Sequence, residues 1–233
     1  MAKVTDANKV LLVEGNADRD FFKKICEPLS FHPDIHVASP NDFDSKSRNG
    51  KQSVLARMEI LLKEFAGSET GSQKRLAIIV DADYKTENGL GFEGTVKQFS
   101  EKLSEHEFIL DSENSNGFIF KHADGLSDIG LWVMPNNDNE GMLEDWIKEC
   151  IHPNEQPIFT HAKSVVDSLE YPKFKPIHKS KAEVATWLAW QEKPGHGLYW
   201  TAHSNNNLLD ANSRLYQKLV IWLNRIYVQE IEV

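Results

Sequence analysis

The chain of 233 residues has little cysteine, no long apolar run and no excess of positive charge. Its two cysteines, Cys26 and Cys150, lie in apolar, helix-like contexts, so a disulfide framework is excluded and buried, reduced thiols in a cytoplasmic protein are expected. No apolar run approaches the roughly 18 residues that a membrane span needs, and the first residues lack the apolar core of a secretory signal. We therefore expect no association with a membrane.

The net charge of −9 argues against a protein that coats nucleic acid by neutralising phosphates, because such proteins are usually basic. Acidic residues can instead be concentrated in a metal site, where bound divalent cations reverse the local sign of the charge. The charge makes a nucleic-acid partner less expected but does not exclude it.

The first part of the chain alternates short apolar runs with amphipathic segments. This alternation predicts βαβ crossovers and therefore an α/β fold with a mostly parallel sheet flanked by helices. The polar stretch Asn41–Lys51 is expected to be a loop. Strands are predicted at Lys9–Val13, Ile35–Ala38, Leu76–Val80, Phe118–Phe120 and Ile129–Met134, and helices at Ala17–Leu29, Ser53–Phe65 and Thr95–Ser104.

The character of the sequence changes after Pro135, where helical patterns follow one another without strands. Residues 1–135 are therefore interpreted as an α/β core and residues 136–233 as a helical extension packed on that core, within one structural unit. The predicted helices of the extension are Glu140–Ile151, Ile158–Leu169, Lys181–Trp190 and Asn212–Tyr227.

Acidic residues follow two of the predicted strands directly. Glu14 comes after the first strand, and Asp81 and Asp83 come after the strand Leu76–Val80. Ligands of open α/β sheets bind at the carboxyl ends of the strands, and residues two apart in an extended segment point the same way. Mg²⁺ takes one or two carboxylates together with water and phosphate, so these acids predict a magnesium site. Asp18, four residues after Glu14 in the first turn of a helix, could reach the same place.

A third acidic segment lies between Pro135 and Asp145. If Glu140 opens a helix, Glu144 lies one turn later on the same face. A structural interpretation stays open for Asp18 and Glu140, because acids in the first turn of a helix are stabilised by its dipole. A lone Asp-x-Asp is also commonly solvated, so the argument depends on the combination of the three acidic segments.

The order of these motifs resembles the Toprim domain, a Rossmann-like α/β domain of topoisomerases, bacterial primases, ribosomal-RNA maturation ribonucleases and overcoming-lysogenization-defect (OLD) nucleases. The resemblance covers about residues 9–135. The whole chain is similar to a compact bacterial Toprim-like family related to the OLD nucleases. The segments that carry this resemblance are Glu14-Gly15-x-x-Asp18, Asp81-x-Asp83, Pro135 through Glu144, Trp187-Leu188-Ala189 and Pro194-Gly195.

The resemblance implies a role for each matching residue. Glu14 would act as general acid or base or complete a metal site, and Asp81 and Asp83 would hold Mg²⁺ or Mn²⁺. A lysine from the C-terminal part would face the scissile phosphate, and Lys181 is its candidate. The further metal ligands that the resemblance implies are Asp18 and either Glu140 or Glu144, of which Glu144 is favoured.

The resemblance implies a Mg²⁺-dependent nuclease that hydrolyses phosphodiester bonds of DNA or RNA, in phage defence or DNA repair, with a partner ATPase or another defence-system protein. The chain departs from many Toprim proteins at Asn16, where they carry lysine. This departure and the negative charge keep open a non-catalytic Toprim-fold module that binds nucleic acid or protein, and also an acidic inhibitor or sensor. The choice of DNA or RNA, of endo- or exonuclease, and of monomer or homo-oligomer stays open.

Overall fold

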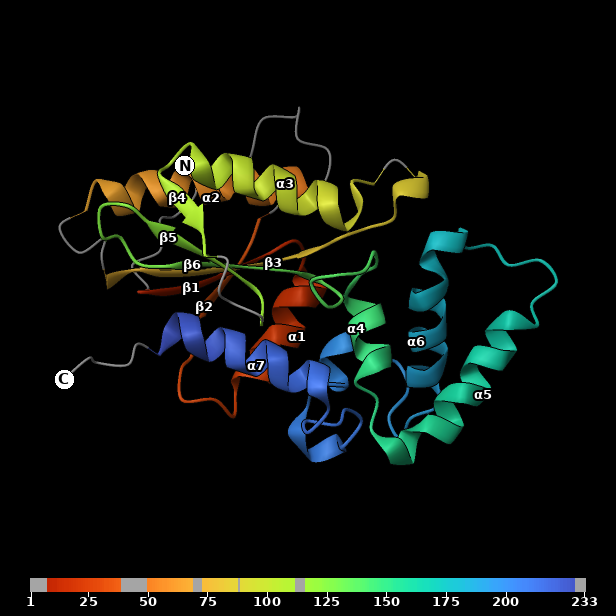
Figure 1. The fold of residues 1–233 in the computed structure, drawn as a ribbon. Coiled ribbons are helices and arrows are strands. Elements are labelled where there is room, and N and C mark those ends of the chain that lie inside the picture. Colours follow the sequence, from red (N-terminus) through yellow and green to blue (C-terminus); the bar gives the residue numbers. More distant parts are fainter. Residues whose placement is uncertain (1–7, 39–49, 69–72, 88, 112–115, 229–233) are drawn as a thin grey trace.

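A computed structural model describes residues 8–38, 50–68, 73–87, 89–111 and 116–228, and a six-stranded sheet lies at its centre (Figure 1). The strand order is β2-β1-β3-β6-β5-β4. The first four strands in this order are parallel. Strand β5 pairs antiparallel with β6, and the edge strand β4 pairs antiparallel with β5. The strands are β1 (Lys9–Val13), β2 (Asp34–Val37), β3 (Arg75–Asp81), β4 (Phe108–Leu110), β5 (Phe118–His122) and β6 (Ile129–Met134).

Helices cover both faces of this sheet (Figure 1). Successive residues of β1 point to opposite faces: Val10 and Leu12 pack with α2 and α3, whereas Leu11 and Val13 pack with α1, α4 and α7. Helices α5 and α6 lie beyond one end of the strands. The helices are α1 (Asn16–Cys26), α2 (Gly50–Ala66), α3 (Gly91–Ser104), α4 (Leu143–Glu149), α5 (Gln156–Asp167), α6 (Lys179–Ala189) and α7 (Arg214–Tyr227).

The C-terminal helix α7 lies against the middle of the sheet because Gly130 of β6 leaves room for it. A Cβ atom at Gly130 would lie 1.7 Å from Cδ1 of Ile226 and 2.7 Å from the ring of Trp222. The hydroxyl of Tyr227, at the end of α7, donates a hydrogen bond of 2.7 Å to the carbonyl oxygen of Val10. Residues after Pro135 thus form part of the hydrophobic core that covers one face of the sheet.

The predicted fold class is confirmed: the fold is a mixed α/β fold with a mostly parallel sheet and C-terminal helices. Cys26 and Cys150 are buried free thiols, and burial raises the pKa of each to about 12. No helix in the described parts of the chain has both the length and the apolar character of a membrane span.

One strand and several element boundaries differ from the sequence prediction. Strand β4 was not predicted, because three residues are too few to show a period. Helix α2 begins at Gly50, so Gly50 and Lys51 are helical, while the rest of the predicted loop lies outside the described residues. Helix α4 begins at Leu143 rather than at Glu140, because Gly141 has a φ of 144° and Met142 is extended.

Candidate functional site

The site is built where β1 and β3 end side by side. The two strands pair in parallel, so Glu14, directly after β1, meets Asp81, the last residue of β3. The backbone N–H of Asp81 donates to Oε1 of Glu14 over 2.9 Å, and the N–H of Leu143 donates to Oδ1 of Asp81 over 3.0 Å. The backbone of β3 and the start of α4 therefore fix the positions of both carboxylates.

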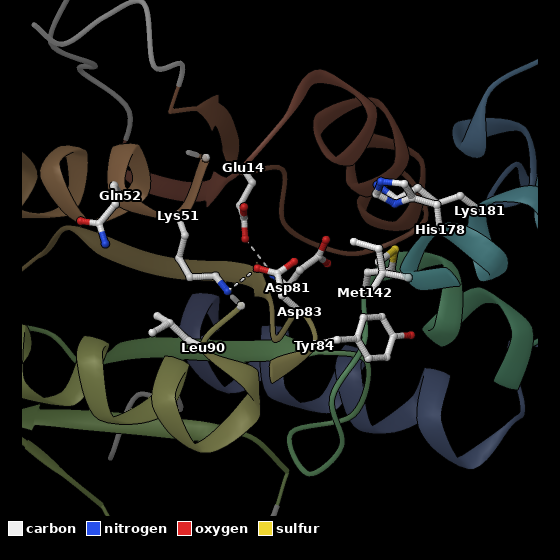
Figure 2. Close-up of a pocket in the computed structure, with 13 residues that line it drawn as sticks. Glu14, Lys51, Gln52, Asp81, Asp83, Tyr84, Leu90, Met142, His178 and Lys181 are labelled. Atoms are coloured by element: carbon white, nitrogen blue, oxygen red, sulfur yellow. Dashed lines mark hydrogen bonds and ion pairs between the residues drawn. The ribbon is translucent and has the colours of Figure 1, made fainter. Parts of the chain in front are cut away.

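These two carboxylates open into a cavity of about 450 Å³. Figure 2 shows the acids between Lys51 on one side and His178 and Lys181 on the other. The cavity brings together residues that are far apart in the sequence: Glu14 directly after β1, the first turn of α2, the end of β3 and the loop after it, Met142 directly before α4, and the start of α6. The charged and polar residues that line it are Glu14, Lys51, Gln52, Asp81, Asp83, Tyr84, His178 and Lys181.

Asp18 and Glu144 lie beside this cavity and add negative charge to it. Asp18 is in the first turn of α1 and Glu144 is in the first turn of α4, with an exposed fraction of 8%. Burial and the charge of Glu144 raise the pKa of Asp18 to about 6. Burial also raises the pKa of Glu144, and Lys181 partly counteracts this change.

The environment of Glu14 and Asp81 disfavours their charged forms. Burial is the main cause in both cases, and it raises the pKa of Glu14 to about 7 against the pull of Lys51. The pKa of Asp81 lies well above its ordinary value, because burial is reinforced by the charges of Glu14, Asp18 and Glu144. Four carboxylates thus concentrate unfavourable negative charge at one end of the parallel strands.

Asp83 lies next to Asp81 for a different reason than predicted. The prediction assumed an extended segment, but β3 ends at Asp81, and Asp83 has a left-handed φ of 61°. Its backbone N–H donates to the carbonyl oxygen of Gly141 over 3.0 Å. The predicted proximity to the cavity is found, whereas the extended conformation is wrong.

Lys51 is one of the residues of this site that the sequence did not predict. Its side chain comes from the first turn of α2 and donates to Oδ2 of Asp83 over 2.8 Å. Gly50 lets this turn approach the acids, because a Cβ atom there would lie 2.8 Å from Oε2 of Glu14. The only local signal was a Gly-Lys pair at the start of an amphipathic stripe, which is too common a pattern to identify a site.

The opposite wall of the cavity carries Lys181 of α6 and His178 of the short 3₁₀ turn Pro176–His178. Lys181 was predicted to face the site, and it lies near enough to Asp18 and Glu144 to lower the pKa of both. His178 was not predicted. Its Nδ1 atom is buried and has no hydrogen-bond partner among the described residues.

A hydrogen-bond network holds α6 against the site. Asp145 accepts hydrogen bonds from the hydroxyls of Tyr84, over 2.9 Å, and Ser180, over 2.5 Å. Lys148 donates to the hydroxyl of Ser180 over 3.0 Å and forms an ion pair of 2.6 Å with Glu183. Tyr84 therefore links the end of β3 to α4.

Glu140 is not brought to the four carboxylates. It precedes α4, so the predicted alignment with Glu144 on one helix face is wrong. Its Oε2 accepts a hydrogen bond of 3.4 Å from the backbone N–H of Lys85. Glu140 thus connects the loop after β3 with the loop after β6.

The donor set of the site fits a hard divalent cation. Glu14, Asp18, Asp81 and Glu144 offer only oxygen atoms, which Mg²⁺ and Mn²⁺ prefer, and binding of a cation would relieve their mutual repulsion. Within the described ranges, no three His, Cys, Asp or Glu side chains already form a group that could hold a metal ion as it stands.

A family model described as "Protein of unknown function (DUF3226)" matches residues 8–228, which is most of the chain. The protein belongs to the DUF3226 family. No curated protein and no solved structure matches this DUF3226 chain.

Proposed function

We propose that the protein is a Mg²⁺-dependent nuclease of the Toprim type, which hydrolyses phosphodiester bonds of nucleic acid. The observation that carries the proposal is the convergence of Glu14, Asp18, Asp81 and Glu144 at the carboxyl ends of β1 and β3. A cluster of buried acids is costly for stability, and such perturbed groups gather at functional sites. The order of the motifs along the chain, which resembles the Toprim domain, supports the same proposal.

Each part of the site has a task in this chemistry. Glu14 and Asp81, with Asp18 and Glu144, would hold Mg²⁺, which neutralises developing charge on phosphate oxygens and activates water. Lys181 and His178 approach from the opposite wall of the cavity, where a phosphate in contact with the acids would have its other oxygens. Lys181 is the group best placed to stabilise negative charge on that phosphate.

Glu14 is the candidate for the proton transfer. In the metal-free site, burial raises the pKa of its carboxyl to about 7, so a Glu14 carboxyl that is not bound to the cation exchanges a proton near neutral pH. In the proposed reaction, Glu14 accepts a proton from the attacking water or supplies one to the leaving oxygen.

A cleavage assay tests the proposal. The purified protein is incubated with labelled single- and double-stranded DNA and RNA in Mg²⁺ or Mn²⁺, alongside Glu14→Gln. The control is Asp124→Asn, an exposed acid in the turn between β5 and β6, away from the strand ends that carry the site. Cleavage by the wild type and the control, but not by Glu14→Gln, is expected. Metal-independent binding without any cleavage would instead support the non-catalytic module.

A further inference from the structure

Lys51 is held in the site by more contacts than a surface ion pair would have. Its ammonium group has three N–H donors, and it lies within hydrogen-bond distance of three oxygen atoms. These are Oδ2 of Asp83 at 2.8 Å, the carbonyl oxygen of Ala82 at 3.3 Å and Oγ1 of Thr95 at 3.2 Å. Lys51 is only 4% exposed and Thr95 is fully buried.

The surrounding backbone fixes Asp83 in this arrangement. The left-handed conformation of Asp83 and its bond to Gly141 aim the side chain toward α2 rather than along the strand (Figure 2). Gly89 closes the other side, because a Cβ atom there would lie 2.9 Å from Cβ of Asp83. The pair of Lys51 and Asp83 is therefore a built part of the cavity wall.

The charge of this pair separates Asp83 from the other acids. Lys51 forms an ion pair with Asp83 and also lowers the pKa of Glu14, whereas Asp81 is surrounded by the like charges of Glu14, Asp18, Glu144 and Asp83 and has no ion pair among the described residues. A divalent cation binds where negative charge lacks a counter-charge. An ammonium group already in contact with Asp83 repels a cation from that carboxylate.

We propose that Lys51 occupies the place of a metal ion at Asp83, so that the divalent cation is held by Glu14 and Asp81 without Asp83. This inference rests on the proposed function and removes Asp83, which the sequence predicted as a metal ligand, from the residues that hold the cation. Lys51 then supplies a permanent positive charge on one wall of the cavity, opposite the charge of Lys181. Asp83 serves to position Lys51 and does not ligate the metal.

The test measures the binding of Mn²⁺ to the full chain. Binding is monitored as the loss of the electron paramagnetic resonance signal of free Mn²⁺. Lys51→Met frees the carboxylate of Asp83 and should bind one more Mn²⁺ per chain than the wild type. The charge-balanced double variant Lys51→Met/Asp83→Asn should bind the same number as the wild type, with an affinity within about tenfold. Asparagine tolerates the left-handed conformation of Asp83.

The controls are Asp81→Asn, which should lose Mn²⁺, and Lys51→Arg, which should keep the wild-type number. Loss of Mn²⁺ by the double variant would show that Asp83 is a ligand and would overturn the inference while the proposed function survives. An unchanged number of ions in Lys51→Met would overturn it as well. A wild type that binds no Mn²⁺ would overturn the proposed function together with this inference. Circular dichroism shows whether each variant is folded.

Discussion

At Asp81 the site opposes folding, because a buried carboxyl lies among other acids. Burial and four neighbouring acids raise its pKa, so the folded protein binds a proton there more strongly than the unfolded chain does. The unfolding free energy of the metal-free protein therefore contains a penalty that grows as the pH rises above the unfolded pKa. Glu14, with a pKa of about 7 in the fold, adds a penalty of the same sign between its ordinary value and neutral pH.

Replacing Asp81 with asparagine should stabilise the metal-free protein. The amide has no charge to bury, and its oxygen can still accept the hydrogen bond from the N–H of Leu143. In EDTA at pH 8, we expect the melting temperature to rise by about 2–4 °C, the shift that roughly 1 kcal/mol gives in a chain of this size. The difference should shrink toward pH 4, where the wild-type carboxyl is protonated. A lower melting temperature for Asp81→Asn at pH 8 would contradict this electrostatic account.

Lys181→Met should reduce kcat of cleavage about 10²-fold, because it removes one charged donor facing the proposed phosphate position. KM should change less than kcat if Lys181 acts mainly in the transition state. Lys179→Met is the matched control, since Lys179 is an exposed lysine of the same helix that pairs with Asp167. Equal effects of both substitutions on kcat would show that Lys181 has no specific role in the proposed site.

Among single residues, the sequence predicts those whose role follows from their position at the end of a strand or the start of a helix. Glu14 and Asp81 could be predicted because each directly follows an apolar strand. Lys51 and His178 could not, because the acids that they face across the cavity come from segments far along the chain. The backbone twist that places Asp83 against Lys51 also leaves no mark in a short motif.

Helix α6 is the element that completes the cavity, and a buried ion pair joins it to α4. Glu183 of α6 is 1% exposed, and it forms an ion pair of 2.6 Å with Lys148 of α4. This ion pair lies next to the hydrogen bond that the hydroxyl of Ser180 donates to Asp145. The position of Lys181 therefore depends on α4 and α6 remaining joined.

Lys148→Met should destabilise the protein by about 3–5 kcal/mol, because it leaves the charge of Glu183 buried without a partner. The double variant Lys148→Met/Glu183→Met should recover most of that loss, since both charges are removed together. Urea denaturation of the two single variants and the double variant measures the coupling. Additive losses in the double variant would show that the two residues do not interact.

Helix α7 depends on its close approach to β6. Gly130→Ala should cost about 1–3 kcal/mol, because the new methyl group would overlap Ile226 and Trp222 in a packed core. Gly197→Ala is the control, since its Cβ atom would meet only Tyr199 at an ordinary 3.6 Å. Denaturant unfolding of both variants checks the difference. A Gly130→Ala variant as stable as the control would show that α7 does not lie this close to the sheet.

The elements themselves were largely predictable, since apolar runs mark the buried strands and apolar stripes mark α1, α2 and α7. Their ends were less so. The start of α4 is set by the backbone of Gly141 and by the bond from the N–H of Met142 to Asp145, and no periodicity shows either. That shift of the helix start separates Glu140 from Glu144 and decides which of them lies near the site.

At the scale of the whole molecule, the net charge of −9 is consistent with nucleic-acid binding only if cations mediate part of the contact. The cavity meets this requirement in the proposed function. Fixed positive charges come from Lys51 and Lys181 on its two walls, and a mobile one would come from Mg²⁺ between Glu14 and Asp81. The topology brings these groups together because β1 and β3 are adjacent parallel strands and the C-terminal helices fold back over their ends.

The measurement that tests the central claim most directly is cleavage of a mixed pool of labelled DNA and RNA as a function of Mg²⁺ concentration, for the wild type and Asp81→Asn side by side. The account predicts cleavage by the wild type that rises with Mg²⁺ to a plateau and disappears in EDTA, and no cleavage by Asp81→Asn at any Mg²⁺ concentration. Cleavage that is equal in both proteins, or no cleavage by the wild type in Mg²⁺ or Mn²⁺, would contradict it.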